Sequence, residues 1–363
     1  MNARADAAAP SASTWAHRAD IAQQSIDEFF GADDRRIAHM TFPRRLHEPF
    51  HYWWLAHLVD VRLDAFERTR RVAWAEDAAR VARGIRRRNR GSLYNDYFDD
   101  MLWFALALQR LRTAAGDVAA GEDARALWEY SFRRGWNDAF GQSLAWRTQQ
   151  LAYKNTPANG PFAILAARLA AADGDPRALE YARRGFDWLT TRMRGADGIV
   201  DDGVNRTGDG TVDHWRFTYN QGLYIGAAVE IGRATGDRTP LRAAEETALA
   251  TIRQLTGGGV FVSEDDGGDS GLFRGIFYRY LGLLLPHLDP GAAGRLELVA
   301  FVRGSTDSLW ESAQRDGLML AGDDWRSTPT GRVSLATQLS AVMAVEMRAA
   351  LERSEAIGVG TPA

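Results

Sequence analysis

The stretch "FALALQRLRTAAGD" at residues 104–117 returns as "FAILAARLAAADGD" at 162–175 and as "YIGAAVEIGRATGD" at 224–237. Each copy is an Ala-rich apolar segment with helical character that stops at a Gly, the residue best suited to a left-handed helix end. An Asp follows each Gly and can cap the next helix. Because the copies recur about every 60 residues, they predict one helical hairpin per repeat.

Helical periodicity extends over most of the chain. The expected helices cover residues 14–30, 49–69, 72–89, 98–115, 121–137, 160–173, 176–194, 220–235, 239–256, 273–287, 291–313 and 333–354. Small side chains on the first helix of each pair predict an inner position, and the more charged second helix predicts an outer one with one wet face. We therefore expect an all-α fold, an (α/α)6 barrel of six hairpins. An open superhelix of stacked hairpins is the competing arrangement, but neither end shows a polar capping repeat.

Composition bounds the domain count and the function. The 363 residues are 45% hydrophobic and 25% charged, as in ordinary globular proteins. We expect one catalytic domain over residues 13–356, with flexible segments at 1–12 and 357–363. The net charge of −3 does not favour nucleic acid, and the arginines between 83 and 90 are interpreted as a solvated helix end.

The absence of Cys excludes disulfides, thiolate catalysis and Cys-ligated metal. No segment has the apolar core of a secretory leader or the length of a membrane span, so we expect a cytoplasmic protein without membrane insertion. We also expect a monomer.

A polar and aromatic cluster precedes each of four inner helices. The clusters are "YNDYFDD" (94–100), "WRTQQLAYKNTPANGPF" (146–162), "DHWRFTYNQGLY" (213–224) and "SEDDGGDSGLFRGIFYRY" (263–280). Because all inner helices of such a barrel run the same way, these clusters are expected to converge on one rim. An aromatic mouth with a few polar groups is a typical ligand site.

The pair Asp99–Asp100 has two interpretations. Asp is a good helix starter, and four other Asp pairs, at 33–34, 201–202, 265–266 and 323–324, cannot all be catalytic. The aromatic neighbours and the inner-helix position favour chemistry for this pair. Adjacent helical residues point about 100° apart, so one carboxyl group can approach an anomeric carbon while the other reaches the leaving oxygen.

Four motifs in this order and spacing resemble glycoside hydrolase family 76, the endo-acting α-1,6-mannanases and related mannan-modifying enzymes. They are "YFDDMLWFALALQRL" (97–111), "YKNTPANGPFAILAARL" (153–169), "FTYNQGLYIGAAVEI" (217–231) and "LFRGIFYRYL" (272–281). The resemblance covers about residues 50–350 and implies an (α/α)6 barrel. It also implies retaining hydrolysis, with Asp99 as nucleophile and Asp100 as general acid/base whose pKa is raised.

By the same resemblance, the remaining clusters would form sugar subsites. The expected substrate-binding residues are Tyr94, Asn95, Trp103, Trp146, Lys154, Asn155, Asn159, Asp201, Asp202, Tyr219, Asn220, Gln221 and Arg274. Helix capping remains open for Asn159 and Asn220, core packing for the two Trp, and a salt bridge to Glu264 for Arg274. No cofactor or metal is expected, because the acidic loop at 263–271 lacks EF-hand spacing.

Three alternatives share this barrel. A transglycosidase would trap the same intermediate with a sugar instead of water. A sugar isomerase or epimerase would use a His, and only His214 lies in a rim cluster. A non-catalytic mannan-binding protein would need the aromatic rim without both aspartates. The expected partner is an α-1,6-mannan, a linkage shared by the fungal mannan backbone and the mannan core of actinobacterial lipoglycans.

Overall fold

The computed structural model describes residues 11–264 and 268–357. Its helices are α1 (Ala12–Phe30), α2 (Tyr52–Thr69), α3 (Val72–Arg88), α4 (Phe98–Ala115), α5 (Val118–Gly135), α6 (Thr156–Asp173), α7 (Pro176–Trp188), α8 (Thr218–Thr235), α9 (Thr239–Gln254), α10 (Phe273–Leu284), α11 (Ala293–Ser312) and α12 (Leu335–Ile357). Apart from residues 11, 12 and 357, the two expected terminal segments lie outside the described residues.

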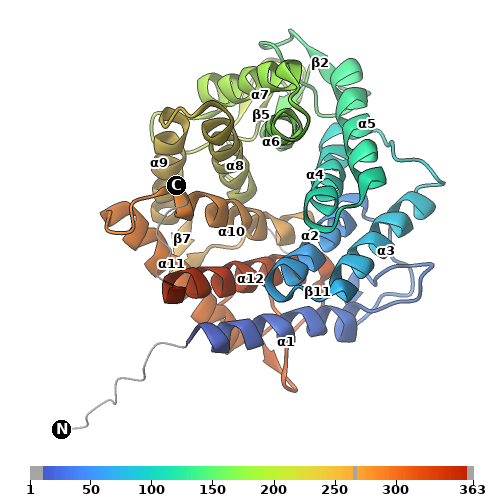
Figure 1. Cartoon of the computed structure of the whole chain (residues 1–363), viewed down its shortest axis with the longest axis vertical. Helices are drawn as coiled ribbons and strands as arrows, with labels where there is room; N and C mark the ends of the chain where they lie inside the picture. Colours follow the sequence, from blue (N-terminus) through green and yellow to red (C-terminus); the bar gives the residue numbers. More distant parts are fainter. Residues whose placement is uncertain (1–10, 265–267, 358–363) are drawn as a thin grey trace.

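The even-numbered helices form a closed inner ring (Figure 1). Each packs against the next, from α2 through α4, α6, α8 and α10 to α12, and α12 packs back against α2. The odd-numbered helices lie outside, with α3, α5, α7 and α9 each against the inner helix before it and α1 against α12. The predicted (α/α)6 barrel is therefore confirmed, and closure of the ring rules out the open superhelix.

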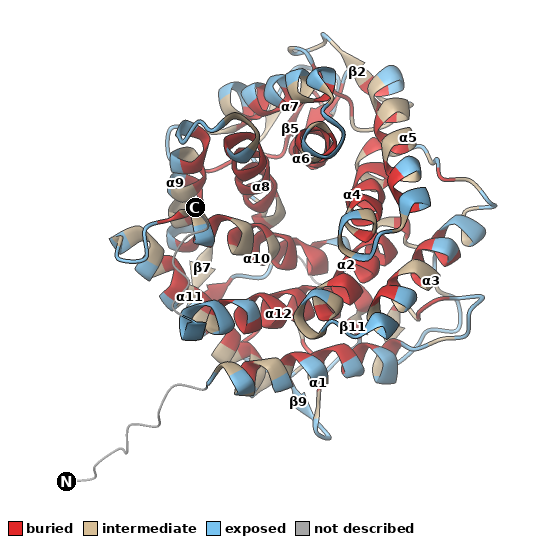
Figure 2. Cartoon of the chain, in the orientation of Figure 1, coloured by how far each residue is buried: buried red, intermediate tan, exposed pale blue. Residues whose placement is uncertain are grey.

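Burial follows the two layers (Figure 2). Inner helices such as α8 are buried on nearly all sides, whereas α7 buries only one stripe and exposes the rest. This difference explains the sequence pattern, because a helix with neighbours on every side needs small apolar residues and an outer helix needs one apolar face.

Glycine lets the inner helices approach closely. A Cβ atom on Gly222 of α8 would lie 2.8 Å from the Phe277 Cα of α10, and one on Gly275 of α10 would lie 2.5 Å from the Ser340 Cα of α12. Both distances are far below van der Waals contact with backbone atoms, which cannot move aside. These two positions therefore require Gly, which explains part of its abundance in a helical chain.

The three repeats end as their sequence predicts. Gly116, Gly174 and Gly236 adopt left-handed conformations with φ of 77°, 67° and 73° at the ends of α4, α6 and α8. Asp117 and Asp175 then cap α5 and α7 through their side chains. In the third repeat Arg238 holds the cap position of α9, and Asp237, one residue earlier, accepts the Thr239 amide at 2.8 Å.

Two-residue strands connect the helices. They are β1 (Thr41–Phe42), β2 (Trp136–Asn137), β3 (Ser143–Leu144), β4 (Lys154–Asn155), β5 (Gly203–Val204), β6 (Val212–Asp213), β7 (Thr256–Gly257), β8 (Val260–Phe261), β9 (Gln314–Arg315), β10 (Leu318–Met319) and β11 (Val333–Ser334). They pair as β4–β5–β6 and as the antiparallel pairs β1–β11, β2–β3, β7–β8 and β9–β10. Many lie in the connections that lead into inner helices, so they shape the mouth of the barrel where those helices begin.

Candidate active site

The four predicted clusters meet at the barrel mouth formed by the N-terminal ends of the inner helices, which we call the N-terminal mouth. The Trp146 indole of the second cluster donates a 2.9 Å hydrogen bond to Asp99 Oδ2 of the first. The Tyr219 ring of the third cluster stacks on Phe273 of the fourth, with centroids 3.8 Å apart. Segments far apart in the sequence thus build one site, as the inner-helix pattern predicts.

Asp99 and Asp100 both lie in the first turn of α4 and are partly exposed. The position preceding the helix is occupied by Tyr97, whose side chain makes no capping bond, and the Phe98 amide donates to the Trp146 carbonyl at 2.9 Å. That backbone bond fixes the start of α4 against the loop that carries Trp146. The aspartates are therefore held in place by the fold without acting as the helix cap residue.

The two carboxyl groups have unequal surroundings. Asp99 accepts the Trp146 indole N–H through Oδ2 and the Asp100 backbone N–H through Oδ1, the latter at 2.9 Å. Asp100 accepts one bond, from the Asn95 amide at 3.2 Å. Two donors on Asp99 favour its ionised form more than the single donor on Asp100 does.

Charge and burial act in the same direction on both groups. Burial raises the pKa of Asp99, and its hydrogen-bond donors oppose that rise. Burial also raises the pKa of Asp100 well above its ordinary value, and the negative charges of Asp99 and Asp269 raise it further. Asp100 is thus the member of the pair that keeps its proton to higher pH. Of the two negative neighbours, Asp99 is adjacent in the sequence, whereas Asp269 belongs to the fourth cluster.

Aromatic rings gather beside the pair. Trp53 lies between Trp103 and Phe273, with centroids 6.4 and 6.5 Å away, and Phe273 continues to Tyr219 and Phe217. We call these five residues the aromatic group. Trp53, Tyr219 and Phe217 are partly exposed, whereas Trp103 is almost fully buried. Trp103 therefore supports the group from beneath, in agreement with its core-packing interpretation.

Asp202 is the centre of a buried network. It accepts hydrogen bonds from the hydroxyl groups of Tyr153 and Tyr219, each at 3.1 Å, from the Asn220 amide at 3.1 Å and from Arg206 at 2.8 Å. Only 2% of Asp202 is exposed and its carboxylate is bonded to the protein, and its contact with sugar hydroxyls at the rim stays a prediction. Its function in the structure is to hold Tyr219 and Asn220 in place.

Asp201 lies beside this network and is partly exposed. It accepts from His214 Nδ1 at 2.8 Å, and Arg216 lies 3.9 Å from its other oxygen. Asn220 is buried, but its Oδ1 has no hydrogen-bond partner among the described residues. Asp201 and Asn220 thus remain predicted substrate contacts.

Four other predicted contacts are buried and bonded to the protein. Lys154 donates to the Ser143 carbonyl at 2.7 Å, and burial lowers its pKa to about 7. The Asn155 side chain caps α6. The remaining two are Asn159, whose amide joins the Leu144 backbone and the Asn155 carbonyl, and Gln221, which joins the Val200 backbone. All four are at most 3% exposed and support the loops in this structure, and their direct contact with sugar stays a prediction.

The last three predicted residues lie in different surroundings. Asn95 contacts Asp100, as described above. Tyr94 is exposed, but its aromatic side chain packs on Tyr130 of the outer helix α5. It therefore points away from the inner helices. Arg274 is buried, donates to the Asp323 carbonyl and lies near the Trp325 ring. Burial raises the pKa of Glu264 to about 7, and its bonds to Thr218 and the charge of Arg274 offset only part of that rise. Glu264 accepts from the backbone and hydroxyl of Thr218 and forms no ion pair with Arg274 among the described residues.

Sequence reasoning missed Trp53 and Asp269. Asp269 Oδ1 accepts both the Trp53 indole at 3.0 Å and the Trp54 indole at 2.7 Å. The signal was available, because "HYWWLAH" at residues 51–57 begins another inner helix with an aromatic cluster. His57 lies outside the four predicted clusters, yet its ring contacts Trp53 and Trp103, and burial lowers its pKa to about 3.

Within residues 11–264 and 268–357, no three histidine or acidic side chains are grouped so as to hold a metal ion. The predicted rim loop at 263–271 includes residues 265–267, which lie outside the described residues. No helix in the described part of the chain is long and apolar enough to cross a membrane.

A closed ring of inner and outer helices with an unequal carboxyl pair beside partly exposed aromatic rings defines a class of barrel suited to glycosidic bond chemistry. Comparison with known proteins identifies the family within that class. The chain belongs to glycosyl hydrolase family 76, whose model matches residues 14–358.

Solved structures give the same result. The chain is 41% identical to the Lin0763 protein of Listeria innocua, with a TM-score of 0.90 over 94% of this chain and 98% of that one. It is 33% identical to an inactive variant of a Salegentibacter alpha-1,6-mannanase, with a TM-score of 0.88 over 93% and 99% of the two chains. In that variant two consecutive aspartates are replaced by asparagine, and the structure contains alpha-1,6-mannotriose.

Among curated proteins, the chain resembles the mannan endo-1,6-alpha-mannosidase of Eremothecium gossypii. The identity is 28% over 242 residues, which is 60% of this chain and 48% of the relative. The matched part thus spans about half the length of that relative.

Proposed function

We propose that this protein is a retaining, endo-acting α-1,6-mannanase in which Asp99 is the nucleophile and Asp100 the general acid/base. Family membership supports a glycoside hydrolase. The fungal mannan endo-1,6-alpha-mannosidases and the Salegentibacter alpha-1,6-mannanase support the choice of an internal α-1,6-mannosidic bond as substrate.

In the first step, Asp100 donates its proton to the glycosidic oxygen while an Asp99 carboxylate oxygen attacks the anomeric carbon. The bond between that carbon and the leaving oxygen breaks, and a mannosyl ester forms on Asp99. Burial raises the pKa of Asp99 to about 7, and the Trp146 indole and the Asp100 amide oppose this rise by favouring the ionised form. The same two bonds fix the orientation of Asp99 for this attack.

In the second step, Asp100, now ionised, accepts a proton from water. The resulting hydroxide oxygen attacks the same carbon and displaces Asp99, so two inversions give net retention. The bond from the Asn95 amide to Asp100 restricts the orientation of this carboxyl group. A sugar hydroxyl in place of water would give transglycosylation by the same atoms.

The observation that carries this proposal is the unequal environment of two adjacent carboxyl groups at one mouth of the barrel. Burial raises the pKa of both carboxyl groups; two N–H donors oppose this rise at Asp99, whereas two negative neighbours add to it at Asp100. Groups whose surroundings separate their pKa values in this way can act as nucleophile and acid in one site. Partly exposed Trp53, Tyr219 and Phe217 offer apolar faces for the C–H surface of a sugar.

The test is incubation with linear α-1,6-mannooligosaccharides, followed by chromatography for product length and proton NMR for the anomer formed first. We expect internal cleavage and initial release of the α-anomer. Release of the β-anomer would contradict the assignment of Asp99 as nucleophile, and products longer than the substrate would indicate transglycosylation.

A matched set of variants separates an enzyme from a binding protein. If the protein only binds mannan, the wild type and the double variant Asp99→Asn/Asp100→Asn will both bind mannotriose and neither will shorten it. Under our proposal, only the variant leaves the sugar intact.

A further inference from the structure

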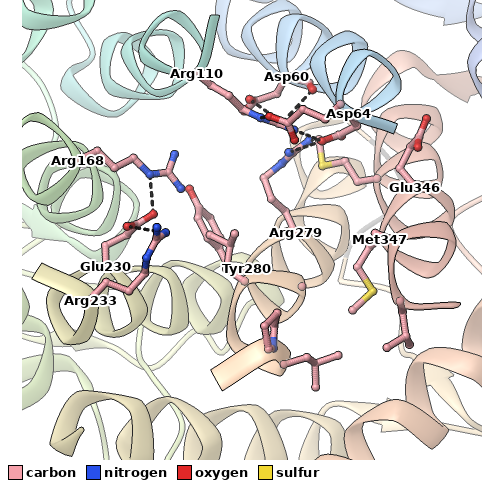
Figure 3. A pocket seen from close by; sticks show the side chains of 18 of the residues that line it. Asp60, Asp64, Arg110, Arg168, Glu230, Arg233, Arg279, Tyr280, Glu346 and Met347 are labelled. Carbon is pink, nitrogen blue, oxygen red and sulfur yellow. Dashed lines mark hydrogen bonds and ion pairs between the residues drawn. The ribbon is translucent and has the colours of Figure 1, made fainter. Parts of the chain in front are cut away.

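A cavity lies at the opposite end of the barrel from Asp99 and Asp100. Its volume is about 930 Å³, and its lining includes the C-terminal halves of all six inner helices (Figure 3). We call this end the C-terminal mouth. Cavities of this size are in the range, about 300–1,000 Å³, that holds small-molecule ligands.

The cavity is separate from the candidate active site. His57 contacts Trp53 and Trp103 of the aromatic group on one side. The charges that act on His57 from its other neighbours, Asp60 and Arg279, belong to the C-terminal mouth. The buried His57 side chain and its neighbours therefore lie between a ligand in the cavity and the catalytic pair.

Charged side chains in the cavity wall are arranged in pairs. Arg110 lies 2.7 Å from Asp64 and 3.2 Å from Asp60, and Arg279 lies 2.8 Å from Asp64. On the facing side, Arg168 Nε donates to Glu230 at 2.7 Å (Figure 3). Such pairs place N–H donors and carboxylate acceptors side by side. Each hydroxyl group of a sugar both donates and accepts, so adjacent sugar hydroxyls can bond to both members of a pair.

Polar groups in the wall lack partners. Gln109 of α4 is 1% exposed, and neither its amide oxygen nor its amide nitrogen has a hydrogen-bond partner among the described residues. Arg279 Nε is also unpartnered. Buried polar groups are nearly always bonded in folded proteins, so an amide that lacks both a donor and an acceptor indicates a missing polar partner.

The charge balance favours a neutral ligand over an anion or a cation. The lining contains seven arginines and five acidic residues. Six inner helices also end here, and each helix C-terminus contributes a partial negative charge of about one half, so the excess of positive side chains is largely offset. Leu283, Pro286, Leu288 and Met347 form an apolar part of the wall, suited to the C–H face of a sugar ring.

We propose that the C-terminal mouth is a second binding site, which takes a neutral sugar and is independent of the catalytic pair. Arginine–carboxylate pairs and Gln109 contact its hydroxyl groups, and the apolar wall packs against its ring. The inference rests on the cavity alone, so it stands or falls separately from the proposed mannanase activity.

The test uses methionine methyl groups as reporters. Met343 and Met347 line the cavity, whereas Met101 lies in the first turn of α4 beside Asp100. Protein labelled with carbon-13 at the methionine methyl groups is titrated with α-1,6-mannotriose and, separately, with inorganic phosphate, and each signal is assigned by a Met→Leu variant. The double variant Asp99→Asn/Asp100→Asn is used so that the sugar stays intact.

We expect mannotriose to shift the Met343 and Met347 signals in a saturable way and phosphate to leave them unchanged. Gln109→Leu, which keeps the side-chain size, should weaken this response at least tenfold and leave the Met101 response unchanged. Tyr280→Phe, which removes one hydroxyl from the lining, is a second variant in case Gln109→Leu fails to fold, and it should also weaken binding.

Unmoved Met343 and Met347 signals at saturating sugar would overturn the proposal, as would shifts that neither variant affects. A response to phosphate alone would overturn the assignment to a neutral sugar. Loss of the Met101 response with the cavity response intact would instead count against the proposed active site, so the two failures are distinguishable.

Discussion

The two mouths of the barrel differ in how they treat buried charge. At the C-terminal mouth, Asp64 is bonded to two arginines. At the N-terminal mouth, Asp99 and Asp100 lie side by side, and their recorded partners are uncharged N–H groups. Paired charges are held in one ionisation state, whereas unpaired adjacent carboxyl groups have raised pKa values and can exchange protons. One fold thus provides a mouth built for stability and another suited to chemistry.

Replacing either member of the carboxyl pair should produce the largest effect. We expect Asp99→Asn and Asp100→Asn each to lower turnover of α-1,6-mannotetraose by roughly 1,000-fold or more, because each removes a group that reacts directly. Thermal unfolding should show both variants folded. Asp64→Asn at the other mouth is the control and should keep turnover within about threefold. Normal turnover in either Asp99 or Asp100 variant would contradict the comparison.

Breaking the ion pairs of Asp64 at the C-terminal mouth should lower the stability of the protein. Asp64→Ala leaves Arg279 buried without its bonded carboxylate, which should lower the free energy of unfolding by about 3–5 kcal/mol. The double variant Asp64→Leu/Arg279→Met removes both charges and should recover most of the loss. Urea unfolding measures both. If the double variant is as unstable as Asp64→Ala, the pairing is not what stabilises this mouth.

Replacing a residue that supports the active-site loops should affect both stability and turnover, each to an intermediate extent. Asn159→Ala removes three hydrogen bonds that hold the strand leading to Trp146, and we expect a loss of about 2–3 kcal/mol in unfolding free energy. Turnover should also fall, by roughly tenfold, because Trp146 orients Asp99. Asn89→Ala is the matched control, since Asn89 bonds two carbonyl groups at the end of α3 outside the inner ring. It should cost about 1 kcal/mol and leave turnover unchanged.

Sequence periodicity predicted the ring because its signals are local. Gly116, Gly174 and Gly236 end helices through their own backbone preference, and the small residues of inner helices reflect contact on all sides. The meeting of four distant clusters followed from topology alone, since parallel inner helices must begin at one end. Every predicted helix was found, with boundaries mostly within a few residues.

The roles of single residues within the clusters were harder to predict, because the polarity of a side chain does not reveal whether it points to a ligand or to the protein. Asn159, Gln221 and Lys154 have the composition of ligand contacts, yet their polar atoms satisfy backbone groups of neighbouring loops. Which partner an amide meets depends on loop geometry that no local pattern encodes. The cavity at the C-terminal mouth was equally hard to predict, since its charged residues come from seven helices.

The smallest effect we expect is a difference in pH dependence between the mouths. The pKa of Asp100 is raised, so the folded state binds more protons than the unfolded state above about pH 4, and wild-type stability falls as pH rises through that range. Asp100→Asn mimics the protonated group, so its stability relative to wild type should increase as pH rises from about 4 to about 8.

Asp60 should behave in the opposite way. Burial acts to raise its pKa, but Arg279 and Arg110 outweigh that effect and lower it. Its contribution to stability is therefore present above about pH 4 and is lost as pH falls below that value. The destabilisation by Asp60→Asn should then grow between about pH 2 and pH 5, where the Asp100→Asn difference is only beginning to develop. Urea unfolding of the three proteins across pH measures both slopes. If the stability of both variants relative to wild type changed with pH in the same direction, the two mouths would not differ in how they shift carboxyl pKa values.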